Sequence, residues 1–159
     1  MDSAVPEIVL NCSRVIAYAI VDDSITFIER GNFFVDGKLL GAVQRLAIFQ
    51  NVNEDDIMIF HCDNEWNVLG AAGGNASVED AKQWAERSYK GLMKKWVPTG
   101  TTEEEVIAYL DEEFASEKCS FCGKWPLDVK LMIGDKVRIC NFCVDKFYEI
   151  VHEADEGLA

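Results

Sequence analysis

Long apolar runs are missing from this sequence: none of its 159 residues belongs to a stretch of the roughly 18 apolar residues that a membrane span needs. The first residues, 1–7, also lack the basic start and apolar run of a signal peptide. Without an export signal, six cysteines favour a reducing compartment, and metal binding rather than disulfides. We therefore expect a cytoplasmic protein that does not bind membranes.

Basic residues are scarce, with 15 Lys and Arg against 28 Asp and Glu, a net charge of −13. Residues 1–115 hold 20 acidic and 9 basic side chains, and residues 116–159 hold 8 and 6. Nucleic acid is not an expected partner, because phosphate groups are bound by Lys and Arg. A basic protein partner suits this charge, although acidity also serves solubility alone.

Two C-x-x-C motifs carry the clearest chemical signal. Cys119 and Cys122 form the first pair, Cys140 and Cys143 form the second, and seventeen residues separate the pairs. This spacing is typical of a tetrahedral Cys₄ zinc site in which each tight turn supplies two thiolates. Four ordinary core thiols or two disulfides are the alternatives. A thioredoxin-like redox site fits poorly, because it would leave the second pair unexplained.

The segment from Cys119 onward resembles the zinc-binding domain of ClpX, the AAA+ unfoldase subunit of the Clp protease. The resemblance rests on C-x-F-C-G-K at 119–124, on I-C-x-x-C-V at 139–144, and on apolar positions between and after these motifs. It implies a treble-clef arrangement: short strands at Val129–Ile133 and Lys136–Ile139, a Gly134-Asp135 turn, and a helix from Asn141 to about His152. Val144, Phe147, Ile150 and Val151 would form one helix face.

The resemblance also implies a function in zinc binding, dimerisation and recognition of protein segments, with Clp components as candidate partners. Leu131, Trp125 and Leu127 are predicted to form an apolar patch for self-association, for a partner, or for docking on the preceding domain. The sequence has no Walker A motif: Gly31–Leu39 has five residues between its glycines where four are required, and Leu39 replaces the Ser or Thr that binds magnesium.

The preceding residues predict an α+β domain with an antiparallel sheet. Hairpins are expected for Val15–Val21 with Ser24–Glu29, and for Ile57–Cys62 with Asn67–Gly70, and Asp36-Gly37 is a turn signal. The segment 39–50 suits either a helix or a strand. Helices are predicted after the N-cap Ser77 and after a Thr102/Glu105 capping box.

No catalytic residues are predicted. His61 and Cys62 are consecutive on a predicted strand, so they would point to opposite faces and not share a proton. Cys62 and Cys12 are expected to be small buried side chains, and His152 is not expected to bind zinc, because four cysteines complete its coordination.

The sequence thus predicts two domains: an acidic α+β domain at 1–115 and a ClpX-like Cys₄ zinc module at 116–159. The zinc is expected to be structural, held by Cys119, Cys122, Cys140 and Cys143. The leading hypothesis is a non-enzymatic interaction protein that dimerises or engages Clp components as an adaptor or decoy. The alternative is an immunity or antitoxin-type inhibitor of a basic toxin such as a nuclease.

Overall fold

The computed structural model describes residues 5–126 and 129–156. The chain divides into two compact units, Met1–Ile107 and Ala108–Ala159, here called the N-terminal and C-terminal units. The division falls within helix α2 (Glu103–Glu113), N-terminal to the boundary that the sequence suggests at residue 115. Among the described residues, no helix has both the length and the apolar character to cross a membrane.

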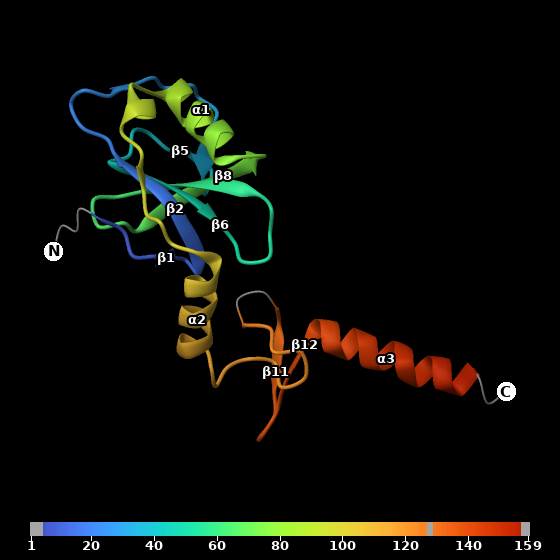
Figure 1. Cartoon of the computed structure of the whole chain (residues 1–159). Coiled ribbons are helices and arrows are strands. Elements are labelled where there is room, and N and C mark those ends of the chain that lie inside the picture. Colours follow the sequence, from blue (N-terminus) through green and yellow to red (C-terminus); the bar gives the residue numbers. More distant parts are fainter. Residues whose placement is uncertain (1–4, 127–128, 157–159) are drawn as a thin grey trace. The chain divides into compact units, whose positions relative to one another are not determined.

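A six-stranded antiparallel sheet forms the centre of the N-terminal unit (Figure 1). Its strand order is β1-β2-β6-β7-β8, and β10 pairs with β2 beside β1. These strands are β1 (Val9–Leu10), β2 (Ser13–Ile20), β6 (Arg45–Gln50), β7 (Ile57–Cys62), β8 (Val68–Asn75) and β10 (Val97–Pro98). Both faces of β6 are buried, which explains its nearly continuous apolar sequence and makes 45–50 a strand rather than a helix.

Two apolar clusters cover the two faces of this sheet. Leu46, Ile48 and Ile59 lie on the face that helix α1 (Val78–Ser88) covers through Ala81 and Ala85 (Figure 1). Phe49, Phe60, Cys62 and Trp66 belong to the cluster on the opposite face. A register shift between Val15 and Ala17 changes which β2 side chains face each cluster. The sheet therefore has a buried layer on each side.

The predicted helix starts are confirmed. The Ser77 hydroxyl accepts a hydrogen bond from the backbone N–H of Asp80, at 3.1 Å, at the start of α1. At the start of α2, Thr102 N–H donates to the Glu105 carboxylate at 2.8 Å, and Glu105 N–H donates to the Thr102 hydroxyl at 3.3 Å. This reciprocal pair satisfies two backbone donors that a helix start leaves free.

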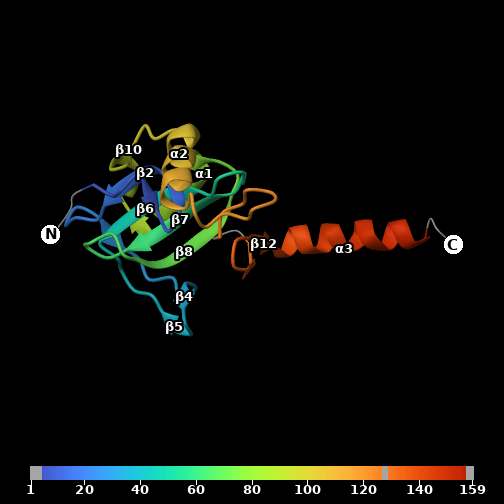
Figure 2. The same ribbon diagram turned by 90° about the horizontal axis from the view of Figure 1, so that it is seen from below.

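The predicted hairpins have different outcomes. β7 and β8 pair as expected, and the Asp36-Gly37 turn joins β4 (Phe34–Val35) to β5 (Lys38–Leu39), a hairpin visible in Figure 2. The predicted pairing of Val15–Val21 with Ser24–Glu29 is wrong. β2 is occupied on one side by β1 and β10 and on the other by β6, and β3 (Thr26–Phe27) pairs with β9 (Tyr89–Lys90) instead.

The Asp22 carboxylate explains why the chain still turns where the sequence signals a turn. It accepts a hydrogen bond from Ser24 N–H at 2.9 Å and forms an ion pair with Lys95 at 2.8 Å. Lys95 directly follows the short 3₁₀ helix η1 (Leu92–Lys94). A local turn was thus predictable from the acidic residues, whereas the partner of the next strand depends on the whole sheet.

The C-terminal unit is small and built on one hairpin and one helix. β11 (Leu131–Ile133) pairs with β12 (Arg138–Cys140), and α3 (Asn141–Glu156) follows directly. The turn lies one residue later than the predicted Gly134-Asp135: Gly134 N–H donates to the Val137 carbonyl at 2.8 Å, which continues the strand register and leaves Asp135 and Lys136 at the turn. Both strands are shorter than predicted, and α3 is longer.

Candidate metal centre

The first pair of cysteines lies in a tight turn before β11. Gly123 N–H donates to the Cys119 carbonyl, and Cys119 N–H donates to the Lys124 carbonyl, both at 3.0 Å. Gly123 has a φ of +71°, in the left-handed region that favours glycine. The glycine of the C-x-x-C-G-K sequence therefore lets the chain reverse after Cys122, so that both thiols point to the same side.

The second pair lies where β12 passes into α3. Cys140 is the last residue of β12, and Cys143 lies in the first turn of α3, so only Cys143 is within the helix. The two pairs are joined by backbone contacts. Ser120 N–H donates to the Arg138 carbonyl at 2.8 Å, and Arg138 N–H donates back to the Ser120 hydroxyl at 2.9 Å. The hairpin thereby brings the second pair against the first.

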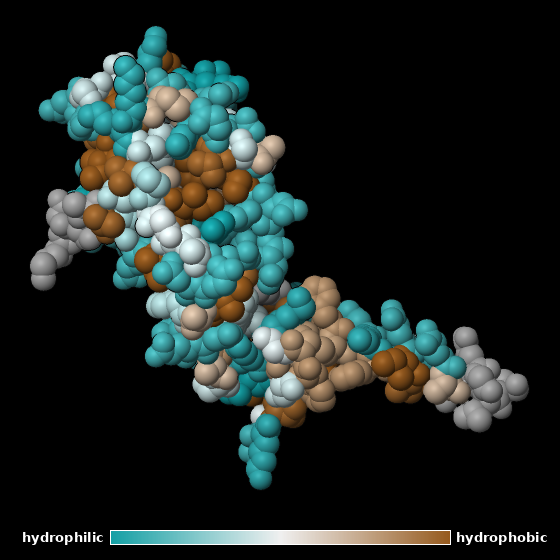
Figure 3. Space-filling view, in the orientation of Figure 1, coloured by the Kyte–Doolittle hydropathy of each residue, from teal (hydrophilic) through white to brown (hydrophobic). Residues whose placement is uncertain are grey.

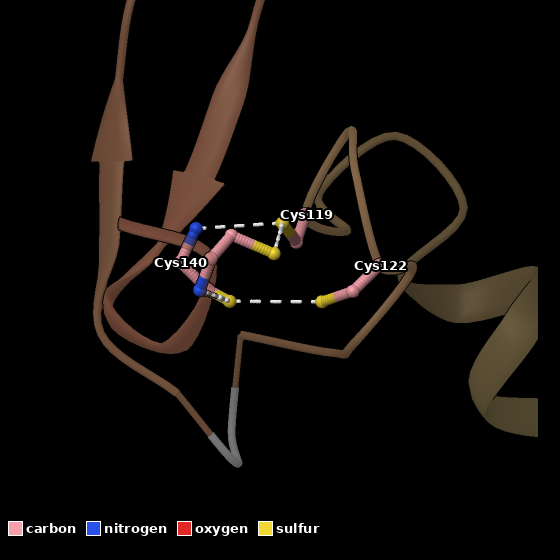
Figure 4. A group of neighbouring side chains, drawn as sticks. Cys119, Cys122 and Cys140 are labelled. Carbon is pink, nitrogen blue, oxygen red and sulfur yellow. Dashed lines mark hydrogen bonds between the residues drawn. The ribbon is translucent and has the colours of Figure 1, made fainter. Parts of the chain in front are cut away.

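The four sulfur atoms lie together at the spacing that one metal ion requires (Figure 4). The Sγ–Sγ distances are 3.8 Å for Cys119 and Cys143 and 3.6 Å for Cys122 and Cys140, and all four atoms lie within 4.8 Å of one another. Zinc–sulfur bonds of about 2.3 Å in a tetrahedron give sulfur–sulfur edges of about 3.8 Å. These distances fit a Cys₄ zinc site, and all six cysteines of the chain are free of disulfides.

The pKa values of the clustered thiols also favour a bound cation. Burial opposes ionisation of Cys119, but backbone N–H groups of Cys122, Phe121 and Cys140 outweigh it and lower the pKa of Cys119 to about 6. Burial raises the pKa of Cys143 to about 12, and the neighbouring thiols Cys122, Cys140 and Cys119 add to this rise. One thiol is thus ready to ionise, whereas ionising all four requires the charge of a metal ion.

Burial separates the four ligands into an inner set and one outer member. Cys119, Cys140 and Cys143 are buried, with Leu131 and Ile139 packed against them, and Cys122 is exposed. Backbone N–H groups of Cys140 and Cys143 point at the sulfurs of Cys119 and Cys140, each at 3.4 Å. Four protein sulfurs complete a tetrahedral zinc and leave no position for a reacting water, so the site suits a structural metal.

The end of α2 is attached to this module by a contact that sequence reasoning missed. The Asp111 carboxylate accepts hydrogen bonds from the Lys118 ammonium and from Trp125 Nε1, the latter at 3.2 Å. The Lys118 ammonium also lies 5.7 Å from the centre of the Trp125 ring. Hydrogen bonding by Lys118 lowers the pKa of Asp111. An acidic helix followed by Lys and Trp gives no spacing signal, so only the fold reveals the contact.

The predicted apolar patch is arranged differently from expectation. Leu131 packs against the cysteines and Trp125 is half-buried against Asp111, while Leu127 lies outside the described residues. From Cys119 onward, the exposed apolar side chains lie instead in the first cysteine turn, on the β11–β12 hairpin and along α3. They are Met132, Ile133, Val137, Phe121, Phe142, Phe147, Tyr148, Ile150 and Val151.

The other sequence candidates lie apart from the metal cluster. His61 packs on the α1 side of the sheet, stacked on Phe33 with ring centres 4.3 Å apart, and Cys62 belongs to the cluster on the other face. Burial raises the pKa of Cys62 to about 12, which keeps it a thiol. Cys12 is half-buried in the β1–β2 turn, and His152 contacts the Tyr148 ring. Among the described side chains, none of these residues belongs to a group of three or more possible metal ligands.

These features define a Cys₄ zinc-binding module. Comparison with protein families then identifies it: residues 117–153 match the family model of the ClpX C4-type zinc finger. The match lies within the C-terminal unit and spans well under half of the chain. The chain has no significant match among curated proteins or among solved structures. The C-terminal unit therefore carries a ClpX-type zinc finger.

Proposed function

We propose that this chain is a non-enzymatic interaction protein in which the zinc finger, with a treble-clef fold, binds protein segments and dimerises. The proposal extends to a role as an adaptor or decoy of Clp-type protein unfolding, in which Clp components are the partners and the acidic unit carries a second partner. The observation that carries the proposal is the exposed apolar face of α3, next to a metal cluster that leaves no catalytic position.

This face consists of Val144, Phe147, Ile150 and Val151, spaced three and four residues apart. Ile150 is 52% exposed and Val151 is 59% exposed, although both are strongly apolar. Figure 3 shows hydrophobic side chains following α3 away from the hairpin. Phe121 of the first cysteine turn extends the face, because its ring meets that of Phe147 edge to face at 5.1 Å between centres.

A second copy of the same face is the simplest partner for it. Helix faces with apolar residues at this spacing pair with each other and remove the side chains from water. The polar side of α3 carries Asp145, Lys146, Glu149 and Glu153. The zinc site fixes the start of the helix, so the metal would organise the surface rather than react.

The mass of the zinc-loaded full chain in solution, measured by light scattering after gel filtration, tests dimerisation. The wild type is expected at twice the chain mass, and Ile150→Ser is expected to shift toward the monomer. Asp145→Ser on the polar side of α3 is the matched control and should leave the dimer intact. A monomeric wild type at concentrations of about 100 µM, well above the dissociation constants of functional dimers, would contradict the proposal.

Partner capture from a native lysate separates the proposal from the alternative. The immobilised wild type is expected to retain Clp components, and Cys140→Ser, which lacks one zinc ligand, is expected to lose them. The alternative is an inhibitor of a basic toxin, and the 17 acidic against 9 basic side chains of residues 1–107 support it. A basic partner that Cys140→Ser still retains, and that salt releases, would favour this alternative.

A further inference from the structure

A groove of about 560 Å³ opens on the N-terminal unit. One wall is the segment leading into β1, with Val5, Glu7 and Leu10. The other wall is the β7–β8 turn and the start of β8, with Glu65, Trp66 and Val68. Figures 1 and 2 both show the β7–β8 turn beside the N-terminal segment. The volume lies in the range of pockets that hold ligands.

One wall of the groove contains an edge strand of the sheet, β1. β1 and β8 stand at the two ends of the strand order, so each has a side without a strand partner in the described part of the chain. Backbone N–H and C=O groups on such sides accept an added extended segment. A peptide in this groove would therefore meet an open strand edge on the β1 wall.

The wall formed by the β7–β8 turn is held in place by contacts within the unit. Trp66 is only 5% exposed, its ring meets Tyr18 edge to face at 5.7 Å, and the Arg45 guanidinium lies 5.0 Å from the ring centre. The Asp63 carboxylate holds the turn by accepting hydrogen bonds from the backbone N–H groups of Glu65 and Asn67, at 2.8 and 2.9 Å. A preformed site of this kind loses less entropy on binding.

The charge of the residues that line the groove indicates which class of ligand it would bind. Glu7 and Glu65 face the groove from its two walls, and none of the described residues that line it is basic. Both carboxylates are exposed, so they can attract a cation without a large desolvation cost. A second copy of this acidic unit would meet like charge, and a phosphate-bearing ligand would be repelled.

We infer that this groove binds an extended peptide segment of a partner protein, with a Lys or Arg side chain between the two carboxylates and apolar side chains against Leu10, Trp66 and Val68. The site concerns the N-terminal unit alone and does not depend on the role proposed for the zinc finger.

The test is a titration of the zinc-loaded full chain with the capped peptide Val-Lys-Val-Lys-Val, followed through backbone amide shifts in NMR spectra. Shifts are expected at residues 5–11 and 65–68, and they should be absent with the matched peptide Val-Glu-Val-Glu-Val. The double variant Glu7→Gln, Glu65→Gln is expected to weaken binding about tenfold. A double variant with the same charge change away from the groove, Glu79→Gln with Glu104→Gln, should bind as the wild type does.

Three results would overturn the inference. The first is no shift at these amides with the lysine peptide at millimolar concentration. The second is equal binding of the glutamate peptide, which would remove the role of charge. The third is equal weakening by the groove variant and the control variant, which would show a general attraction to an acidic protein. The solution mass of the chain, which tests the zinc finger's role, is unaffected by any of these outcomes.

Discussion

The two units of this chain hold themselves together in different ways. The N-terminal unit buries apolar side chains on both faces of its sheet, from Leu46 and Ile59 on one face to Phe49 and Phe60 on the other. In the C-terminal unit, the buried side chains among those described are Leu110 and three of the four clustered cysteines. A small unit that buries so little apolar surface depends on another source of stability, here a metal.

This contrast explains where each unit exposes apolar surface. The large unit covers both sheet faces, and exposed apolar side chains such as Phe34 of β4 and Val97 of β10 lie outside its two buried clusters. The small unit uses its thiols as a core and leaves the apolar side of α3 in water, as the exposed fraction of Ile150 shows. A metal that replaces a hydrophobic core frees apolar side chains for contact with partners.

The largest expected effect is zinc loss. Cys140→Ser, or removal of zinc with a chelator, should unfold residues 117–153 and leave the sheet of the N-terminal unit intact. The reason is that structural zinc contributes about 10 kcal/mol or more to the folding of such modules. Amide spectra before and after treatment, with zinc counted by mass spectrometry, measure this. Cys12→Ser is the control and should keep one zinc per chain. Unfolding of both units together would contradict the view that zinc stabilises only the C-terminal unit.

A cavity made in the sheet should destabilise the N-terminal unit and leave the zinc finger intact. Leu46→Ala removes a fully buried side chain from β6 and is expected to destabilise the N-terminal unit by about 3 kcal/mol. Denaturant unfolding followed at amides of the sheet measures this loss. Leu69→Ala on β8, where the side chain is 40% exposed, should cost less than 1 kcal/mol or so and serves as the control. A lower zinc content in Leu46→Ala than in the wild type would contradict the view that the two units have separate cores.

Acid should weaken the N-terminal unit through His61. Burial lowers the pKa of His61 to about 4 from its ordinary value of 6.5. Between these values the unfolded chain binds a proton that the folded chain does not, so stability falls as pH falls, by about 1.4 kcal/mol per pH unit. This part of the stability is fully present above pH 6.5 or so and is lost toward pH 4.

The contribution of His61 is isolated by comparison of variants. His61→Phe should remove about 2 kcal/mol of the loss between pH 6.5 and 5, read from denaturant unfolding at sheet amides. His152→Phe, which changes the other histidine of the chain, should keep the wild-type slope. Equal slopes for the wild type and His61→Phe would show that His61 is not buried as a neutral ring.

The smallest effect concerns α2, which crosses the division between the units. Thr102→Ala removes the hydroxyl that accepts from Glu105 N–H and should cost about 1 kcal/mol. Thr101→Ala leaves this capping box intact and is the matched control. Hydrogen exchange along α2 measures the change. If the variant also speeds exchange within residues 117–153, α2 transmits stability from one unit to the other, and the comparison becomes sharper.

Local signals predicted much of what the structure contains. The capping residues Ser77 and Thr102, the Asp36-Gly37 turn and the β7–β8 hairpin each depend on neighbours within a few residues, so the sequence was enough to place them. The four cysteines were predictable for a related reason. Their spacing reports the geometry of a tetrahedral metal site directly.

Pairings that depend on the whole sheet escaped the same reasoning. β3 pairs with β9, some sixty residues later in the chain, because β2 already has neighbours on both sides. A turn signal says that the chain bends and leaves open which strand it meets next. The exposure of the apolar side of α3 is a second case. The same spacing of Phe147, Ile150 and Val151 would also suit a helix packed on a core.

The sequence by itself determined the metal site, the helix starts, the local turns and the acidic charge. The first three depend on residues that are close together along the chain, and the charge depends on composition alone. The tertiary structure alone decided the strand order, the groove between β1 and β8 and the exposure of Ile150. These features arise between segments that are distant in sequence. Their energies depend on which surfaces are already covered, and composition and spacing do not record that.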